Sequence, residues 1–202
     1  MRTQQHIAGA SQSPVRFKLS LLSAALLHAN FMIPTAQALP QGGQVTAGAA
    51  VIARGNAADT QSISQFTERA VIDWKTFDIG ENETVNFVQP KPDYVLLNRV
   101  NGGGVSSILG KLNADGRVFL INPSGIVFGP KSQLNVGGLL ATTATLSNQD
   151  FMAGQYRFAE AGGGGARVVN QGQITAHDGG LVALVAPGVQ NAGLIQANFG
   201  KV

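Results

Sequence analysis

Two stretches of the sequence repeat each other and decide the fold: residues 170–176 read NQGQITA, and residues 191–197 read NAGLIQA. Four residue types recur in the same order and at one constant offset, pairing Asn170 with Asn191, Gly172 with Gly193, Ile174 with Ile195 and Ala176 with Ala197. A repeat this short is too small for a propeller blade and has no helical half, so it predicts one coil of a β-solenoid.

Each residue type in this repeat has a structural task in the predicted coil. The Asn and Gly of each copy are the predicted repeat turns, where they supply tight or left-handed backbone. Ile and Ala supply rows of side chains that face the interior, and the same offset places Leu181 opposite Val202. One coil gains roughly 10 kcal/mol from burial, which is less than the entropy cost of ordering its backbone. Coils therefore stabilise one another by stacking.

Alternation of apolar and polar residues recurs along the chain after residue 38, between turn-forming residues, and predicts an all-β fold. The segment 118–121, VFLI, is apolar at every position and is predicted to be covered on both faces. Inward-facing side chains are predicted on four strands: Val85 and Phe87, Leu134 and Val136, Ile174 and Ala176, and Ile195, Ala197 and Phe199.

The N-terminal segment 1–38 has the pattern of a secretory signal peptide. Arg16 and Lys18 precede an apolar run over residues 19–27, and Ala36-Gln37-Ala38 forms a small-residue cleavage site. We expect the Sec translocon to export the chain to the periplasm and signal peptidase to cut between Ala38 and Leu39. The alternative, a membrane anchor, is disfavoured because the apolar run is too short to span a bilayer.

Composition excludes several classes of function. The 202 residues contain no Cys, which rules out disulfides, thiol nucleophiles and thiolate metal sites. Three of the 14 basic residues and none of the 11 acidic residues lie in the predicted leader, so the mature chain carries no net charge. Because the sequence has no basic cluster, nucleic acid is not an expected partner.

The sequence predicts neither an enzyme nor a cofactor. The stretch from Gly104 to Lys111 has some features of a phosphate loop, but its spacing is wrong and no hydroxyl residue follows the lysine. His177 is the only histidine after the leader, so no histidine cluster can bind zinc. A loose acidic set is irregularly spaced, which indicates a solvated surface: Asp73, Asp78, Glu81, Glu83 and Asp93. The glycine run Gly162–Gly165 is predicted to be a surface loop.

A second turn signal lies between two strongly apolar segments, residues 118–121 and 126–128. Asn122-Pro123-Ser124-Gly125 has Pro at the second and Gly at the fourth position, as a β-turn favours, and Ile126 opens the next strand. The turn chemistry accounts for all four residue types. Such a turn could also nucleate folding or serve as an exposed handle for a partner.

Several ordered segments resemble the N-terminal secretion domain of two-partner secretion exoproteins, which is the filamentous haemagglutinin family, and above all its high-molecular-weight adhesin branch. The matching segments read IDWKTFDIGENETVNFVQ at 72–89, NRV at 98–100, ILGKL at 108–112 and GRVFLINPSGI at 116–126. The resemblance covers essentially all of residues 39–202. The family's usual turn reads Asn-Pro-Asn-Gly, and here Ser124 replaces its third residue.

This resemblance implies a right-handed parallel β-helix with an N-terminal cap. We expect the cap and first strands in residues 39–110, and coils that continue into a longer exoprotein in residues 111–202. The implied function is secretion: a dedicated outer-membrane transporter recognises the chain through its periplasmic POTRA domains, and β-helix folding then starts outside the cell. The turn at 122–126 is the expected partner-recognition motif.

Two other functions remain open from the sequence. The chain could be a surface adhesin module that itself binds host carbohydrate or protein on the flat faces of the solenoid. It could also be a β-helix polysaccharide lyase, which would need calcium-dependent cleavage by the acidic set.

Overall fold

The computed structural model describes residues 38–55, 57–160 and 165–202. The predicted leader apart from Ala38, and the part Gly162–Gly164 of the glycine run, lie outside the described residues. The described part consists of fifteen strands and one short helix, α1 (Asn148–Met152). No helix in these ranges is long and apolar enough to cross a membrane.

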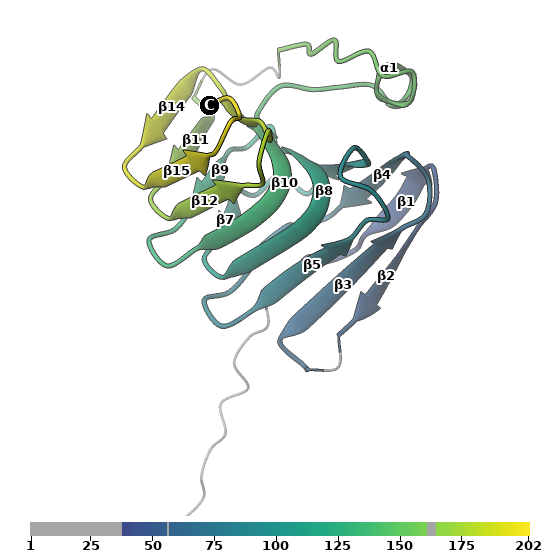
Figure 1. Ribbon diagram of the computed structural model, residues 1–202, viewed down its shortest axis with the longest axis horizontal. Helices are drawn as coiled ribbons and strands as arrows, with labels where there is room; N and C mark the ends of the chain where they lie inside the picture. The colour runs from purple at the N-terminus through teal and green to yellow at the C-terminus, as the bar shows by residue number, and fades with distance from the viewer. Residues whose placement is uncertain (1–37, 56, 161–164) are drawn as a thin grey trace, which may run out of the picture. The chain divides into compact units, whose positions relative to one another are not determined.

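The C-terminal coil shows how the chain winds. β12 (Gln173–Ala176), β13 (Val182–Val185) and β14 (Gly188–Asn191) follow one another around the coil, and β15 (Leu194–Ala197) returns to lie beside β12 (Figure 1). β12 and β15 pair in parallel with Ile174 opposite Ile195 and Ala176 opposite Ala197, which is the offset of the sequence repeat. The predicted repeat is therefore one coil, and the predicted β-solenoid is confirmed.

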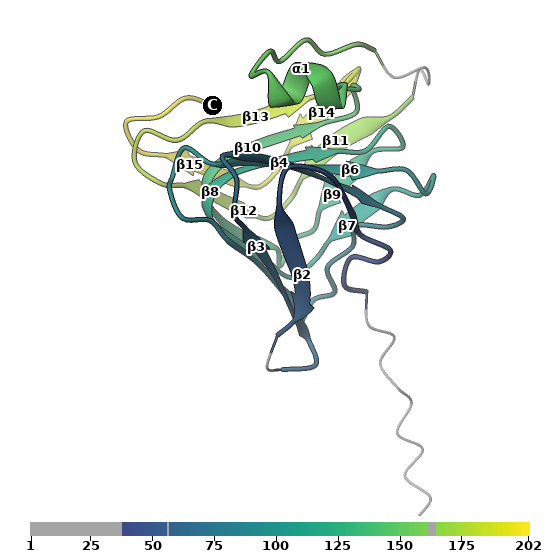
Figure 2. The same ribbon diagram turned by 90° about the vertical axis from the view of Figure 1, so that its right-hand side faces the viewer.

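Parallel strands stack along three faces of the solenoid (Figures 1 and 2). The first face contains β3 (Thr60–Gln65), β5 (Thr84–Val88), β8 (Lys111–Ile121), β10 (Gln133–Thr142), β12 and β15. The second contains β4 (Arg69–Trp74), β6 (Val95–Val100), the C-terminal halves of β8 and β10, and β13. The third contains β7 (Ser106–Ile108), β9 (Ile126–Phe128), β11 (Arg167–Asn170) and β14.

β8 and β10 each run from the first face to the second, and glycine permits the bend that each strand makes between the two faces. A Cβ atom on Gly137 of β10 would lie 2.6 Å from the carbonyl oxygen of Gly116 in β8. The pairing register shifts between Val136 and Gly138, at this same point. Close backbone contact at the bend therefore requires a residue without a side chain.

Two antiparallel strands precede the parallel coils. β1 (Gln44–Ala47) pairs with β4, and β2 (Ala50–Arg54) pairs with β3. Trp74 and Phe77 are buried beside them in an edge-to-face contact with a centroid distance of 5.5 Å. Phe66 is 60% exposed. Parallel pairing starts with β3 on β5 and β4 on β6, within the range 39–110 expected to hold the cap and first strands.

The interior is built from rows of apolar side chains that stack in register from coil to coil. One row contains Val85, Leu112, Leu134, Ile174 and Ile195, and the next contains Ile63, Phe87, Ala114, Val136, Ala176 and Ala197. Most of these side chains are fully buried, and Ile195 and Ala197 pack against the same core while partly exposed. The alternation predicted from the sequence is confirmed for these residues.

An excursion over residues 143–160 carries α1 and covers the outer side of the second face. Gln133 pairs with Lys111 of the coil before it and with Gln173 of the coil after it. The coil from Gln133 to Gln173, which contains the excursion, therefore has more residues than the coil from Lys111 to Gln133. Phe151 of α1 is fully buried, and its ring centroid lies 5.9 Å from that of Phe119. The segment 118–121 is therefore covered on both faces, as its composition predicted.

The repeat slips by one residue where the second copy turns. Leu181 lies opposite Lys201, so the prediction that it faces Val202 is wrong. Phe199 was predicted to face inward with Ile195 and is instead 97% exposed. Strand β15 ends at Ala197, and Phe199 takes a φ of 51° within the turn, which breaks the alternation.

Candidate functional site

The turn at residues 122–125 forms a closed corner between β8 and β9. The Gly125 amide donates to the Asn122 carbonyl at 3.0 Å, which closes the β-turn. The Ser124 amide donates to Oδ1 of Asn122 at 2.9 Å, so the Asn side chain mimics a second turn. The turn predicted from the sequence therefore exists, and its conformation depends on Asn122.

Asn122 also ties this corner to the coils on either side. Its Nδ2 donates to the Gly104 carbonyl at 2.8 Å and to Oγ of Ser106 at 2.9 Å, both in the preceding coil. Its amide donates to the Thr142 carbonyl of the following coil at 3.0 Å. Asn122 is 1% exposed, so these bonds replace the hydrogen bonds to water that its side chain and backbone amide lose on burial.

Gly125 is required by both backbone conformation and space. Its φ is 117°, a region that side-chain-bearing residues rarely adopt. A Cβ atom there would lie 3.0 Å from the Arg167 carbonyl oxygen. Asn122 and Gly125 are thus structural residues, whereas Pro123 is exposed and Ser124 is partly exposed. Pro123 and Ser124 are therefore the residues of the folded corner that another molecule could contact.

The repeat turns are tight but not left-handed. Nδ2 of Asn170 donates to Oδ1 of Asn191 at 2.8 Å, forming an amide ladder between coils. Oδ1 of Asn170 accepts the Gly172 amide at 3.1 Å, and Asn191 accepts the Gly193 amide at 3.3 Å. None of these four is among the described residues with a positive φ. Glycine is needed because a Cβ on Gly172 would collide with the preceding coil.

Four residues of the segments that carry the family resemblance hold the first coils together. Nε1 of Trp74 donates to Oδ1 of the fully buried Asn98 at 3.0 Å. Nε of Arg99 donates to Oδ1 of Asp73 at 2.8 Å, and Nη2 of Arg99 contacts the same carboxylate. Nη1 of Arg99 donates to the Leu146 carbonyl at 3.2 Å, which links this ion pair to the excursion.

A second cation also lies against the excursion. Hydrogen bonding with the Tyr156 side chain raises the pKa of Arg69 above its ordinary value, although burial acts in the opposite direction. The Tyr156 ring packs on Phe119 at a centroid distance of 5.1 Å. Nothing in the sequence pattern predicted this contact, because it joins residues far apart in the chain.

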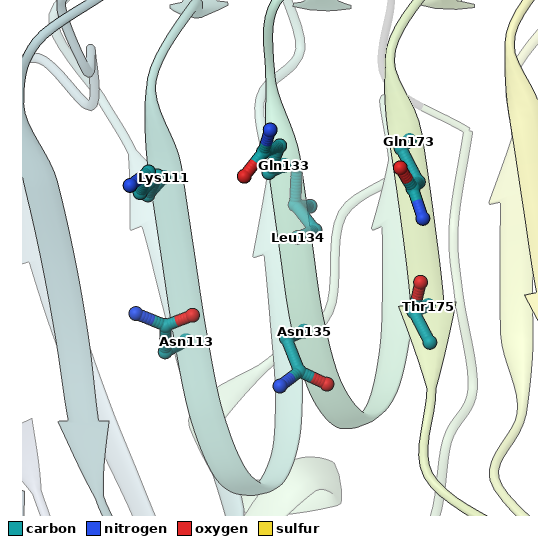
Figure 3. A pocket seen from close by; sticks show the side chains of 7 residues that line it. All are labelled: Lys111, Asn113, Gln133, Leu134, Asn135, Gln173 and Thr175. Carbon is teal, nitrogen blue, oxygen red and sulfur yellow. The ribbon is translucent and has the colours of Figure 1, made fainter.

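The outer side of the first face carries a shallow hollow of about 520 Å³ over β8, β10 and β12 (Figure 3). It is lined by Lys111, Asn113, Gln133, Leu134, Asn135, Gln173 and Thr175. Amide groups stand in rows along successive coils, and Nδ2 of Asn113 donates to Oδ1 of Asn86 at 2.9 Å. This lining offers hydrogen bonds but neither a carboxylate nor an aromatic ring.

The acidic set does not converge on one site, and its interpretation as solvated surface is wrong for three members. Glu83 is 7% exposed, and its Oε2 accepts the Gly80 amide at 2.7 Å. Asp73 lies in the half-buried ion pair described above. Asp78 accepts the Ser107 amide at 2.8 Å. These carboxylates lie on different turns and strands, and each fixes local backbone or an ion pair.

The remaining members of this set are on the surface. Glu81 pairs with Lys131 at 2.8 Å, and this pair is exposed. Asp93 is exposed, as is His177 after β12. Among the described ranges no group of three potential metal ligands comes together.

Comparisons with known proteins agree with this architecture. A family model described as the TPS secretion domain matches residues 36–201. A heme/hemopexin-binding protein of Haemophilus influenzae strain Rd is 36% identical over 206 residues, which cover 92% of this chain and 21% of that protein. A second heme/hemopexin-binding protein of Haemophilus influenzae is 46% identical over 101 residues, or 50% of this chain and 11% of that protein.

A solved structure shares the fold. The crystal structure of the HMW1 secretion domain from Haemophilus influenzae matches with a TM-score of 0.73 at 35% identity, over 77% of this chain and 41% of that one. The chain spans less than a quarter of the first relative's length. The family match over nearly all described residues, together with the stacked parallel coils, shows that this chain belongs to the TPS secretion domain family.

Proposed function

We propose that this domain directs a longer exoprotein to a dedicated outer-membrane transporter and starts β-helix folding outside the cell. The POTRA domains of that transporter recognise it in the periplasm, after the Sec translocon and signal peptidase have acted. The family match is the observation that carries this proposal. The leader pattern of residues 1–38 supports the export route.

The segment 122–126 is the proposed recognition motif, and its last residue, Ile126, is fully buried at the start of β9. It holds two accessible residues, Pro123 and Ser124, on a turn fixed by the buried Asn122. The bonds that close this turn join Asn122 to Ser124 and Gly125, so they do not require the coils to have stacked. Because the chain covers 21% of the first relative, the heme or hemopexin binding in that protein's name is not part of this proposal.

In this proposal, folding of the chain after it has crossed the outer membrane makes transport favourable in the outward direction. Each coil gains buried apolar rows when it stacks on the coil before it, as the rows through Leu112 and Leu134 illustrate. Non-local pairing of this kind forms slowly, which favours a chain that is still unfolded at the transporter. The sequence holds no Cys to form a disulfide in the oxidising periplasm.

Binding to the isolated periplasmic part of the partner transporter tests the recognition step. The double variant Pro123→Ala/Ser124→Lys changes the accessible residues and leaves Asn122 and Gly125 in place. Pro130→Ala is the matched control, because Pro130 is an exposed residue of another turn, closed by the Ser132 amide on the Gly129 carbonyl at 3.0 Å.

We expect the double variant to bind at least about tenfold more weakly, which is a loss of about 1.4 kcal/mol. Its unfolding midpoint in urea should match that of the original chain. The control should bind normally. Equal binding by all three proteins would remove the corner from the recognition surface.

A further inference from the structure

The carboxylate of Glu83 occupies an unusual position for an acidic residue. It is 7% exposed, and it belongs to a turn that the Glu83 amide closes on the Gly80 carbonyl at 2.9 Å. Its Oε2 accepts the Gly80 amide at 2.7 Å, and its Oε1 accepts the Ala38 amide at 2.8 Å. A Cβ on Gly80 would lie 3.0 Å from Oε2, so glycine there gives the carboxylate its space.

The donor to Oε1 belongs to the residue on the leader side of the predicted cleavage site. If signal peptidase cuts between Ala38 and Leu39, the Ala38 amide leaves with the leader. Oε1 would then lose this partner while Oε2 keeps the Gly80 amide, and a carboxylate oxygen that lacks a donor in a buried position is costly.

The residues that follow the cleavage site are held in place independently of the leader. Leu39 is 3% exposed and belongs to the apolar core. The Gln41 amide donates to the Thr76 carbonyl at 2.9 Å, and Nε2 of Gln41 donates to the Leu39 carbonyl at 2.7 Å. Backbone nitrogens of adjacent residues lie about 3.5 Å apart. The Leu39 nitrogen therefore lies about one such step from the Ala38 nitrogen, which is the atom that contacts the carboxylate.

Acidic side chains outnumber basic ones in a neighbouring hollow that Glu83 lines. Asp59, Glu81, Glu83 and Lys111 line the same hollow of about 340 Å³, together with Asn82 and Thr84. Nζ of Lys131 contacts Glu81 at 2.8 Å on the exposed side. Lys111 is exposed, and its amide donates to the Glu83 carbonyl at 2.9 Å. No hydrogen bond among the described residues links its side chain to Glu83.

The geometry points to Glu83 as the receptor for the new N-terminus: after cleavage, the α-ammonium of Leu39 takes the place of the Ala38 amide and forms a buried ion pair with the Glu83 carboxylate. This inference rests on the cleavage site assumed in the proposed function. Hydrolysis adds water across the Ala38–Leu39 peptide bond. The carboxylate product leaves on Ala38, and the amine that remains on Leu39 takes up a proton.

This pairing would couple maturation to folding. Before cleavage Glu83 accepts a neutral amide, and afterwards it accepts a charged donor, which forms a stronger hydrogen bond. The first coils would therefore reach full stability only once the leader has been removed. An export domain that must remain unfolded until it is processed would benefit from this order.

A double-mutant cycle on the length of the chain and on residue 83 tests the inference. One chain begins at Leu39 with a free amine, and the other begins with Met followed by Gln37 and Ala38, which keeps the neutral Ala38 amide. Each is made with Glu83 and with Glu83→Gln, and unfolding in urea is followed for all four. Glu81→Gln is the matched control, because Glu81 is an exposed acidic neighbour.

We expect Glu83→Gln to raise the unfolding equilibrium constant at least about tenfold more in the chain that begins at Leu39 than in the longer chain. Glu81→Gln should affect both chains equally. Acylation of the Leu39 amine at neutral pH should be slow with Glu83 and at least about threefold faster with Glu83→Gln. Equal effects of Glu83→Gln in both chains, or equal acylation rates, would overturn the inference.

N-terminal sequencing of the exported protein separates this inference from the proposed function. An N-terminus at Leu39 supports the pairing. An N-terminus at another residue overturns it, while recognition by the transporter is judged separately by the binding experiment on Pro123 and Ser124.

Discussion

Individual polar residues fix the corners of this solenoid by accepting or donating bonds that the bending backbone leaves open. Asn122 and Asn170 each accept an amide two residues further along the chain. Both also bond to a neighbouring coil, through Ser106 and Asn191 respectively. A single buried side-chain amide at a corner therefore fixes both the local turn and the register between neighbouring coils.

Replacement of Asn122 by Ala should destabilise the domain. The change leaves the Gly104 carbonyl, Oγ of Ser106 and the Ser124 amide without a partner, at a cost of about 2–3 kcal/mol in the free energy of unfolding. Secretion should fall in parallel. Urea unfolding checks the stability, and a wild-type midpoint would contradict the assignment of Asn122 as the residue that fixes the corner.

Replacement of Gly125 by Val should be at least as harmful. A β-branched residue at a φ of 117° is strained, and its Cβ would crowd the Arg167 carbonyl. We expect a loss of about 2–4 kcal/mol in the free energy of unfolding, together with reduced secretion. Gly103 provides a control, because it also has a positive φ and a Cβ there would meet no atom within 4 Å. A larger loss for Gly103→Val would contradict this explanation.

At the scale of elements, the excursion over residues 143–160 acts as a cover for the second face. Leu146 and Phe151 bury an apolar strip that includes Val71, Leu97 and Ile121. Ser147 caps α1, and its Oγ accepts the Asp150 amide at 3.1 Å. The strands of the second face are apolar on both sides, and the excursion covers their outer side in place of a second sheet.

Phe151→Ala should cost about 3–5 kcal/mol in the free energy of unfolding, because it empties a fully buried site against Phe119. Met152→Ala is the control, since Met152 is 37% exposed on the same helix. Hydrogen exchange should show that amides of the excursion lose protection in Phe151→Ala. If the two variants were equally stable, the excursion would not be an integral part of the core.

The sequence predicted those elements whose determinants are local or periodic. The constant offset of the repeat, the inward rows and the corner at Asn122 all follow from spacing and turn chemistry. The roles of Glu83 and Tyr156 depend on contacts with residues distant in the chain, and neither leaves a periodic signal. Phe199 was wrongly placed because alternation was extended past the end of a strand.

At the scale of the molecule, stability is a property of stacking. Every inward row has neighbours on both sides in the middle of the described coils and on one side in the last of them. Leu134 is 2% exposed between Leu112 and Ile174, whereas Ile195, in the same row, is partly exposed. An apolar residue of such a row is therefore expected to contribute more to stability in a central coil than in the last described coil.

This difference can be measured with a matched pair of substitutions. Leu134→Ala should lower the free energy of unfolding by about 3 kcal/mol or more, and Ile195→Ala by about half as much, because part of Ile195 already meets water. Urea titration followed by circular dichroism gives both values. Equal losses would show that the coils do not depend on their neighbours as stacking requires.

The proposed link between stacking and export is tested by the amount of exoprotein released to the medium when a central strand can no longer stack. Leu134→Pro removes an amide near the start of β10, where this strand pairs with both β8 and β12. Asp178→Pro is the control, because Asp178 follows His177 in a turn closed by the Gly180 amide at 2.8 Å and proline suits that position. We expect normal release for Asp178→Pro and at least about a tenfold loss for Leu134→Pro, since the proline removes a hydrogen bond from the sheet. Normal release of Leu134→Pro would show that export does not depend on the stacking of coils.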